Sequence, residues 1–241
     1  MTSTCVILQP SYVPWRGYFD LVHQADVFVF YDDVQYDKHG WRNRNRVKTS
    51  QGTQWMTIPV RAAGNVDEGL RILDVKTNPA ARWAKKHAQT LRQSYARAPH
   101  FTEFAPLVDE IYAESTESLC EFTIASTVRL ARALGVEHTR FVRASELGVG
   151  GERSPRLVEI VRAVGATRYL SGPSAAAYLE PERFVAAGLE LAYAEYDYPE
   201  YPQLHPPYDG AVTIWDTLFM LGAEAPDYIW GERARAHRAR R

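Results

Sequence analysis

Cysteine is nearly absent from this 241-residue sequence, which has only Cys5 and Cys120, far apart along the chain. Two isolated cysteines supply neither a disulfide framework nor a zinc pattern. No apolar run approaches the roughly 20 residues that a membrane-spanning helix needs. The N-terminus also lacks the charged and apolar segments of a signal peptide. We therefore expect a cytoplasmic protein with no membrane partner.

The sequence also lacks the short motifs that identify common enzyme classes. Neither GxGxxG nor GxxxxGK[ST] occurs, so no standard phosphate-binding loop is present. No serine stands in a GxSxG elbow, and the seven histidines form no HExxH motif or i, i+4 pair. The formal net charge of -1 excludes a chain-wide positive field that would attract nucleic acid. We predict no metal site, and the cofactor is left undefined.

What the chain does have is regular alternation of strand and helix patterns. Residues 5–8 and 27–31 predict strands, and residues 18–24 between them suit a helix. A strand–helix–strand unit implies a parallel pair with a right-handed crossover. The same alternation returns in the second half of the chain. The predicted fold class is therefore α/β, with a mostly parallel Rossmann-like sheet, flanking helices and a helical insertion.

The helical insertion is predicted over about residues 83–134, where apolar residues recur at helical spacing from Trp83 onward. Residues 47–60 before it suit a β-hairpin. We interpret residues 1–230 as a single α/β domain and residues 231–241 as a basic, disordered tail.

Polar residues follow several of the predicted strands. In parallel α/β sheets, ligands bind outside the carboxyl ends of the strands. If the strands share one sheet, these polar residues surround a single cleft. The candidate substrate-binding and catalytic residues at these ends are Gln9, Tyr12, Asp32, Asp33, Gln35, Tyr36, Ser171, Gly172 and Ser174.

Three residues are candidates for catalysis. Asp32 and Asp33 are adjacent on a strand and so point to opposite faces. One of them is expected to face the cleft as a general base, metal ligand or ribose acceptor; alternatively, both cap the next turn. His87, on a predicted helix, is the best placed histidine, although a lone histidine on a helix face is more often a packing residue.

Two further segments suit binding. In GWRNRNRVK, Arg42, Arg44 and Arg46 alternate and would share one face of an extended segment, as a clamp for phosphate or carboxylate or as a solvated strand face. Trp41 and Trp55 would be stacking platforms if nucleic acid binds.

The segment SGPSAAAY suits an anion at a helix N-terminus or an ordinary N-cap at Ser174. The proline- and tyrosine-rich loop that contains Tyr201 suits a pocket wall or a surface connection.

These motifs together resemble one known family. The stretches QPSYVPWRGYFDLVHQADVFVFYDDVQYDKHGWRNRNRVK, WAKKHAQTLRQSYARAPHF, TRYLSGPSAAAYL and YDYPEYPQLHPPYDGAVTIWDTLFMLG resemble the WbqC-like family over nearly the whole chain. The resemblance implies an association with O-antigen and other polysaccharide gene clusters, and a glycine or acyl transferase acting on amino sugars. Its motif positions add the substrate-binding candidates Trp15, Tyr18, Trp41, Asn43, Arg44, Arg46 and Lys86.

The predicted function is therefore transfer of a small acyl or aminoacyl group, for example glycyl, onto an amino sugar or related amine in polysaccharide or specialised-metabolite biosynthesis. The partners would be a small-molecule acceptor and an activated acyl, aminoacyl or nucleotide donor, with tRNA only as a donor carrier. One alternative is an ATP-dependent ligase or nucleotidyltransferase. The segment PWRGYF stands where that group carries HxGH, and it has no histidine. Another alternative is a non-catalytic sugar- or RNA-binding module.

Overall fold

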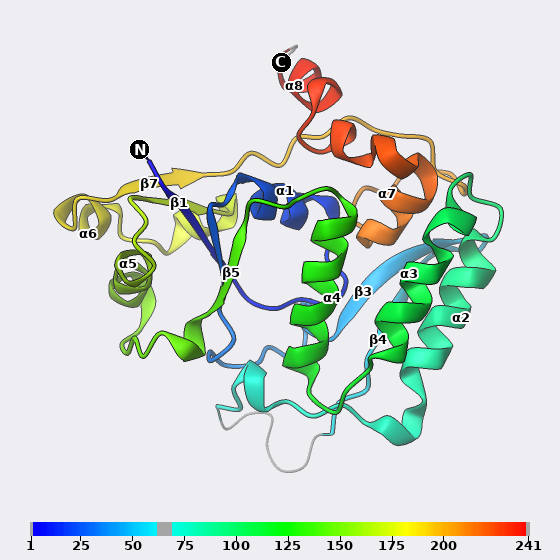
Figure 1. Cartoon of the computed structure of the whole chain (residues 1–241), viewed down its shortest axis with the longest axis horizontal. Coiled ribbons are helices and arrows are strands. Elements are labelled where there is room, and N and C mark those ends of the chain that lie inside the picture. The colour runs from blue at the N-terminus through cyan, green and yellow to red at the C-terminus, as the bar shows by residue number, and fades with distance from the viewer. Residues whose placement is uncertain (1, 62–68, 240–241) are drawn as a thin grey trace.

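A five-stranded parallel sheet lies at the centre of the computed structural model, which describes residues 2–61 and 69–239 (Figure 1). Its strands are β1 (Thr4–Leu8), β2 (Val27–Phe30), β5 (Arg140–Arg143), β6 (Arg168–Ser171) and β7 (Glu190–Tyr193), in the order β5-β2-β1-β6-β7. Each neighbouring pair is parallel. The predicted α/β class with a mostly parallel sheet is confirmed, and the strand order is consistent with a Rossmann-like fold.

The order of the strands reverses direction beside β1. The chain runs outward from β1 to β2 and β5, then crosses back to place β6 and β7 on the other side of β1. The connection that leaves β1 therefore runs toward β2 on one side of the sheet, and the connection that leaves β6 runs toward β7 on the other side. This is the topological switch point, and the crevice outside the strand ends there is where open α/β sheets bind ligands.

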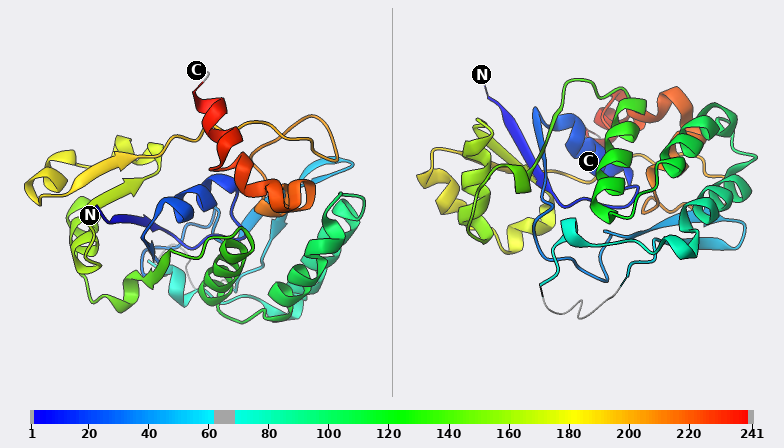
Figure 2. Two further views of the ribbon diagram at one scale, coloured as in Figure 1. Left: turned by 45° about the horizontal axis from the view of Figure 1, so that its top comes forward. Right: turned by 60° about the horizontal axis from the view of Figure 1, so that its bottom comes forward.

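Both faces of the sheet are covered because β2 is apolar on both sides. Phe28 and Phe30 face one core, and Val27 and Val29 face the other, as expected for alternating strand residues. Helices α1 (Arg16–Gln24) and α4 (Leu119–Ala133) pack on the phenylalanine face. Helices α5 (Arg153–Ala163) and α6 (Pro181–Ala186) pack on the valine face, and Figure 2 shows the two groups on opposite sides of the sheet.

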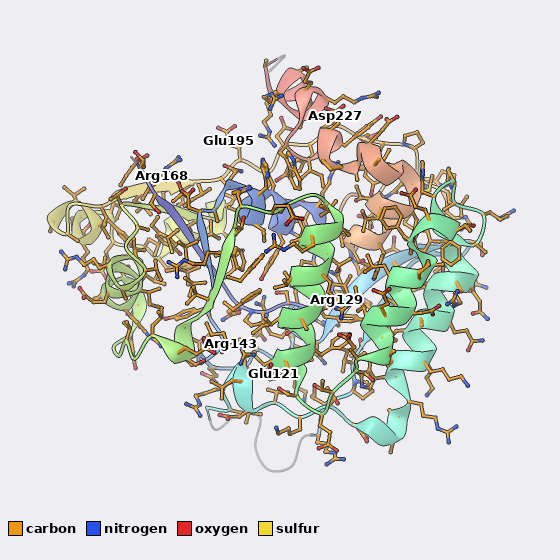
Figure 3. The ribbon with its side chains drawn as sticks, in the orientation of Figure 1. Glu121, Arg129, Arg143, Arg168, Glu195 and Asp227 are labelled. Carbon is orange, nitrogen blue, oxygen red and sulfur yellow. The ribbon has the colours of Figure 1, made fainter. Side chains whose placement is uncertain are left out.

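The predicted insertion is helical, as expected. Helices α2 (Trp83–Tyr95) and α3 (Phe101–Ala113) lie side by side at the edge of the molecule farthest from α6, and α4 returns from them to the sheet (Figure 1). Between sheet and insertion lies the antiparallel hairpin of β3 (Arg44–Thr49) and β4 (Gly52–Thr57). In Figure 3, Glu121 at the start of α4 lies beside Arg143 at the end of β5; the two form an ion pair that ties the insertion to the sheet.

Short turns and two further helices complete the described chain. Helix α7 (Ile214–Leu221) packs in the main core. The 3-10 turns are η1 (Ile72–Asp74), η2 (Pro79–Ala81), η3 (Ala144–Glu146), η4 (Pro173–Ala177) and η5 (Gly222–Tyr228). None of the helices in the two described ranges combines the length and apolar character that crossing a membrane requires.

The expected disordered tail is corrected by the structure. Glu232–Arg238 forms helix α8, and residues 240 and 241 lie outside the described residues. The helix is held because Arg238 donates to the carboxylate of Asp20 at 3.1 Å and to the carbonyl of Ile229 at 2.9 Å. The nearly buried carboxylate of Asp20 is therefore paired with the guanidinium of Arg238, from the far end of the chain.

Candidate functional site

Two adjoining cavities open at the carboxyl end of β1. The first, which we call the aromatic lobe, has a volume of about 430 Å³. The second, the α5 lobe, has a volume of about 680 Å³ and reaches the first turn of α5. Together they form a cleft at the switch point of the sheet, where an α/β fold binds its ligand. The residues that line both lobes are Leu8, Gln9 and Arg42.

Gln9 and Arg42 are the polar residues shared by the lobes. Within the described part of the chain, neither the side-chain amide of Gln9 nor the guanidinium of Arg42 has a hydrogen-bond partner or an ion pair. The Arg42 Nε is fully buried. Burial lowers the pKa of Arg42, partly offset by Tyr18 and Asp37, yet a guanidinium keeps its proton in a protein. A half-buried, unpaired cation is costly, so this arrangement favours an anionic ligand.

The aromatic lobe takes its shape from rings held against glycine. The Trp15 ring packs edge-on against Tyr196 with centroids 5.1 Å apart, and a Cβ on Gly17 would lie 2.4 Å from the Trp15 ring. On the other wall, a Cβ on Gly172 would lie 3.0 Å from the Tyr196 hydroxyl. Gly17 is therefore needed for the close approach of the Trp15 ring, and Gly172 leaves room for the Tyr196 hydroxyl.

The tyrosines of this lobe are hydrogen-bond donors. Burial raises the pKa of both Tyr18 and Tyr196, to about 12 for Tyr196, so both phenols remain protonated at neutral pH. The Tyr18 hydroxyl donates to the carbonyl of Gln9 at 3.3 Å. Among the described residues that line the two lobes, none is Asp, Glu or His. The cleft can therefore bind, orient and donate hydrogen bonds, without a carboxylate or imidazole base.

The turn that carries Gln9 is fixed by the hairpin. The Asn45 side chain donates to the carbonyls of Tyr12 and Val13, at 3.2 and 2.7 Å, and the Tyr12 amide donates to the carbonyl of Trp41 at 2.9 Å. Val13 has a φ of 39°, which is unusual for a β-branched residue. The hairpin thus holds a strained turn in place and sets Gln9 relative to Trp41.

Asp32 and Asp33 both have structural partners. Asp32 is fully buried, and its carboxylate accepts from the Ser145 amide at 3.0 Å and hydroxyl at 2.8 Å. Asp33 pairs with Arg156, whose guanidinium also lies over the Tyr31 ring. The two aspartates follow the end of β2 and contact different partners, and neither lines the cleft. These contacts favour a framework role for each.

His87 and Tyr12 form a buried chain away from the cleft. The Tyr12 hydroxyl lies 2.7 Å from Nδ1 of His87 and 2.6 Å from the hydroxyl of Tyr112. Burial lowers the pKa of His87 to about 4, partly offset by a backbone hydrogen bond with Thr57. The imidazole is therefore neutral near pH 7, and its position supports the insertion rather than contact with substrate. Lys86 is exposed on the same helix.

Most of the other expected binding residues also contact the framework. Tyr201 is buried and donates to Asp216 at 2.7 Å. Arg44 donates to the carbonyl of His39, and Arg46 pairs with Asp209 at 3.6 Å. Four other expected binding residues also line neither lobe: Gln35, Tyr36, Asn43 and Ser171.

The expected anion site at a helix N-terminus is not formed, because Pro173–Ala177 is a five-residue 3-10 turn without a side-chain cap. Ser174 instead lines the aromatic lobe. The predicted residues that the structure brings together there are Gln9, Trp15, Tyr18, Trp41 and Ser174.

Several cleft residues were not among the predicted binding set. The alternation of Arg42, Arg44 and Arg46 predicts one shared face, whereas of these three arginines it is Arg42 that lines the cleft. Tyr196 follows the last strand, so the rule of strand ends could have found it. Arg153 lies at the start of α5 and lines the α5 lobe; no sequence signal marks it.

A separate cavity of about 690 Å³ lies between α2 and α3. Of the predicted site residues, none lines it within the described chain. It is also remote from the strand ends, so the cleft at β1 is the stronger candidate.

Comparisons with known proteins agree with the motif resemblance. A family model described as the WbqC-like protein family matches residues 9–228. The chain is similar to a protein of Mycobacterium tuberculosis (strain ATCC 25618 / H37Rv) named "Uncharacterized protein Rv1507c". The two are 39% identical over 229 residues, which are 92% of this chain and 96% of the relative. No solved structure matches the chain.

Proposed function

Because this chain belongs to the WbqC-like protein family, we propose that it is a transferase that moves a small acyl or aminoacyl group onto the amine of an amino sugar or related molecule. The reaction would serve polysaccharide or specialised-metabolite biosynthesis. The family membership expected from the motifs is confirmed. The transfer reaction is what we propose.

The observation that carries the proposal is the pair of lobes that meet at Gln9 and Arg42. A transfer reaction needs two substrates whose reacting atoms are held within contact distance of each other. Two cavities with a shared polar boundary provide this, one for the acceptor and one for the donor. Holding both in line supplies a large part of the catalysis in such reactions.

The proposed chemistry suits a cleft whose described lining lacks a carboxylate or imidazole base. The acceptor amine attacks the acyl carbonyl, the new C–N bond forms, and the bond to the activating group breaks. The proton lost by the amine goes to the leaving group or to water. Gln9 and the Tyr196 hydroxyl would donate hydrogen bonds to the oxygen on which charge develops.

A product screen tests the proposal. The purified protein would be incubated with amino-sugar acceptors, free and nucleotide-linked, and with acyl thioesters or glycyl-tRNA as donors. Mass spectrometry would detect an acceptor heavier by the acyl group. We expect a product that is lost in Gln9→Ala and retained in the surface variant Arg97→Gln. Absence of product across the panel, together with nucleotide hydrolysis, would contradict the proposal.

The strand order favours one second candidate. Nucleotides bind at the switch point in sheets of this connectivity, so an ATP-dependent ligase or nucleotidyltransferase would use the same cleft. Release of pyrophosphate on addition of ATP and a carboxylic acid would support this alternative over acyl transfer from a preactivated donor.

A further inference from the structure

We propose that the cleft binds a nucleoside diphosphate, as the carrier of the substrate, with Arg42 paired to the phosphates and the base stacked on Trp41. The inference rests on the proposed function in taking the cleft as the substrate site. Binding can nevertheless be measured without any transfer reaction.

Arg42 is the first reason. Its neighbours on the hairpin each have at least one partner for the guanidinium: Arg44 donates to the carbonyl of His39, although its Nε is also buried without a partner, and Arg46 contacts Asp209 and the carbonyl of Ala211. Arg42 faces the boundary between the lobes, with its Nε buried and without a partner. The planar fork of a guanidinium matches the oxygens of a phosphate group. A neutral ligand would leave this cation desolvated and unpaired.

The adjacent aromatic pair is the second reason. Trp41 and Trp55 are 44% and 50% exposed, unusually high for tryptophan. Their centroids are 5.4 Å apart with planes tilted by 34°, so no ring fits between them. Trp41 also lines the aromatic lobe. A flat ring that enters the cleft would therefore stack on the free face of Trp41.

The rear of this platform is supported by cations. The guanidinium carbon of Arg44 lies 4.6 Å from the Trp55 ring centroid, and that of Arg46 lies 5.9 Å from it. These contacts hold Trp55 in place, and Trp55 in turn supports Trp41.

Base and phosphate sites are adjacent because Trp41 and Arg42 are consecutive. The carbonyl of Trp41 accepts from the Tyr12 amide at 2.9 Å, which fixes the backbone between the two side chains. A base on Trp41 then places its phosphates near Arg42, at the entrance to the α5 lobe. The group attached to the diphosphate would then lie at the boundary between the lobes, and the α5 lobe would hold the second substrate.

Isothermal titration of the full chain with defined probes tests the inference. The probes are UDP and ADP, with uridine and inorganic pyrophosphate as the two fragments and glucuronate as a carboxylate. We expect Arg42→Gln to weaken the binding of UDP and of pyrophosphate by about tenfold or more. The affinity for uridine should be unchanged. Trp41→Ala should weaken the binding of UDP and of uridine but not that of pyrophosphate. Trp41→Phe should lose less affinity than Trp41→Ala.

Controls separate local from general effects. Arg97→Gln removes an exposed charge outside both lobes and should leave binding unchanged. A thermal unfolding transition would show that each variant is folded. If Arg42→Gln does not fold, Arg42→Lys is used in its place. Lysine keeps the charge without the fork, so it should recover only part of the affinity.

Two results would overturn the inference. One is binding of neither nucleotide, and the other is nucleotide binding that Arg42→Gln leaves unchanged. Arg42-dependent binding of glucuronate alone would assign the site to a carboxylate instead. Nucleotide binding without acyl transfer would contradict only the proposed function, whereas acyl transfer without nucleotide binding would contradict only this inference.

Discussion

At the scale of single residues, Gly17 controls the shape of the aromatic lobe. The Trp15 ring folds over it so closely that a Cβ would lie 2.4 Å from the ring. Gly17→Ala should therefore displace Trp15 and destabilise the protein by about 1–3 kcal/mol, the usual cost of overpacking. Urea unfolding would measure the free energy and near-ultraviolet circular dichroism the ring environment.

Gly150 offers a matched control for Gly17→Ala. A Cβ at Gly150 meets nothing within 4 Å, so Gly150→Ala should leave both measurements almost unchanged. Equal effects of the two substitutions would show that the contact between Trp15 and Gly17 does not set the stability.

Residue roles in the cleft were only partly predictable. The rule of strand ends selects Gln9 and Ser174, and both line a cavity in the structure, because parallel strands end at one edge of the sheet. The choice among Arg42, Arg44 and Arg46 was not predictable. It depends on which arginine finds a partner, and Asp209, which pairs with Arg46, lies more than 150 residues away along the chain.

At the scale of elements, Asp32 joins the ends of β2 and β5 through Ser145. Its carboxylate accepts both the amide and the hydroxyl of Ser145 in a fully buried position. Because hydrogen bonds to charged groups contribute about 1.5–3 kcal/mol each, we expect Asp32→Ala to cost roughly 3 kcal/mol. Ser145→Ala, which keeps the amide, should cost about half as much.

A double-mutant cycle on chemical unfolding would measure this coupling directly. The combined Asp32→Ala and Ser145→Ala variant should be less destabilised than the sum of the single variants. Additive effects would mean that the two side chains do not stabilise each other.

Helix α8 supports a second prediction at this scale. Arg238 is the cation beside the Asp20 carboxylate. The Asp20 side chain is 2% exposed, and its carboxylate also accepts a hydrogen bond from the Tyr198 hydroxyl at 2.8 Å. Arg238→Ala removes one partner of a mostly buried pair and should cost about 1–3 kcal/mol. Differential scanning calorimetry should show a melting temperature lower by a few degrees.

Arg235 on the same helix provides the comparison for Arg238. Its side chain is exposed and, among the described residues, its guanidinium donates only to the carbonyl of Trp230, at 3.2 Å. Arg235→Ala should therefore shift the melting temperature by much less. A similar shift for both variants would indicate general loss of helix α8 rather than loss of the contact with Asp20.

Elements with strong periodicity were predicted well, and elements fixed by distant contacts were not. The apolar strands and the insertion helices follow from local patterns. Helix α8 does not, because its sequence is rich in charge and its anchor, Asp20, lies in α1. Gly-Pro-Ser after β6 predicts a helix N-terminus but suits a tight turn equally well, and the structure has a 3-10 turn there.

At the scale of the whole molecule, the insertion and the sheet meet at Tyr12. Its hydroxyl contacts His87 of α2 and Tyr112 of α3, while its backbone belongs to the turn that carries Gln9. The geometry of the cleft therefore depends on packing of the insertion, although neither helix lines it. This dependence explains why the motif residues Tyr12 and His87 lie outside the cleft and are still tied to it.

His87 should make the stability of the whole protein depend on pH. Burial lowers its pKa to about 4, whereas in the unfolded chain it is about 6.5. Between about pH 6.5 and pH 4, His87 is protonated in the unfolded state but stays neutral in the folded state. The free energy of unfolding therefore falls as the pH falls through this range. The loss from this group should reach about 2 kcal/mol at pH 5.

Replacing His87 by glutamine isolates this contribution. Glutamine can still accept from Tyr12 and donate to the Thr57 carbonyl, but it does not titrate in this range. Urea unfolding at pH 7.5 and pH 5 should show a smaller drop in His87→Gln than in the native protein, by about 2 kcal/mol. His39→Gln, at an exposed histidine, should leave the drop unchanged. An equal drop in the native protein and His87→Gln would mean that protonation of His87 does not limit stability in acid, and that the contact between Tyr12 and the insertion survives a charged imidazole.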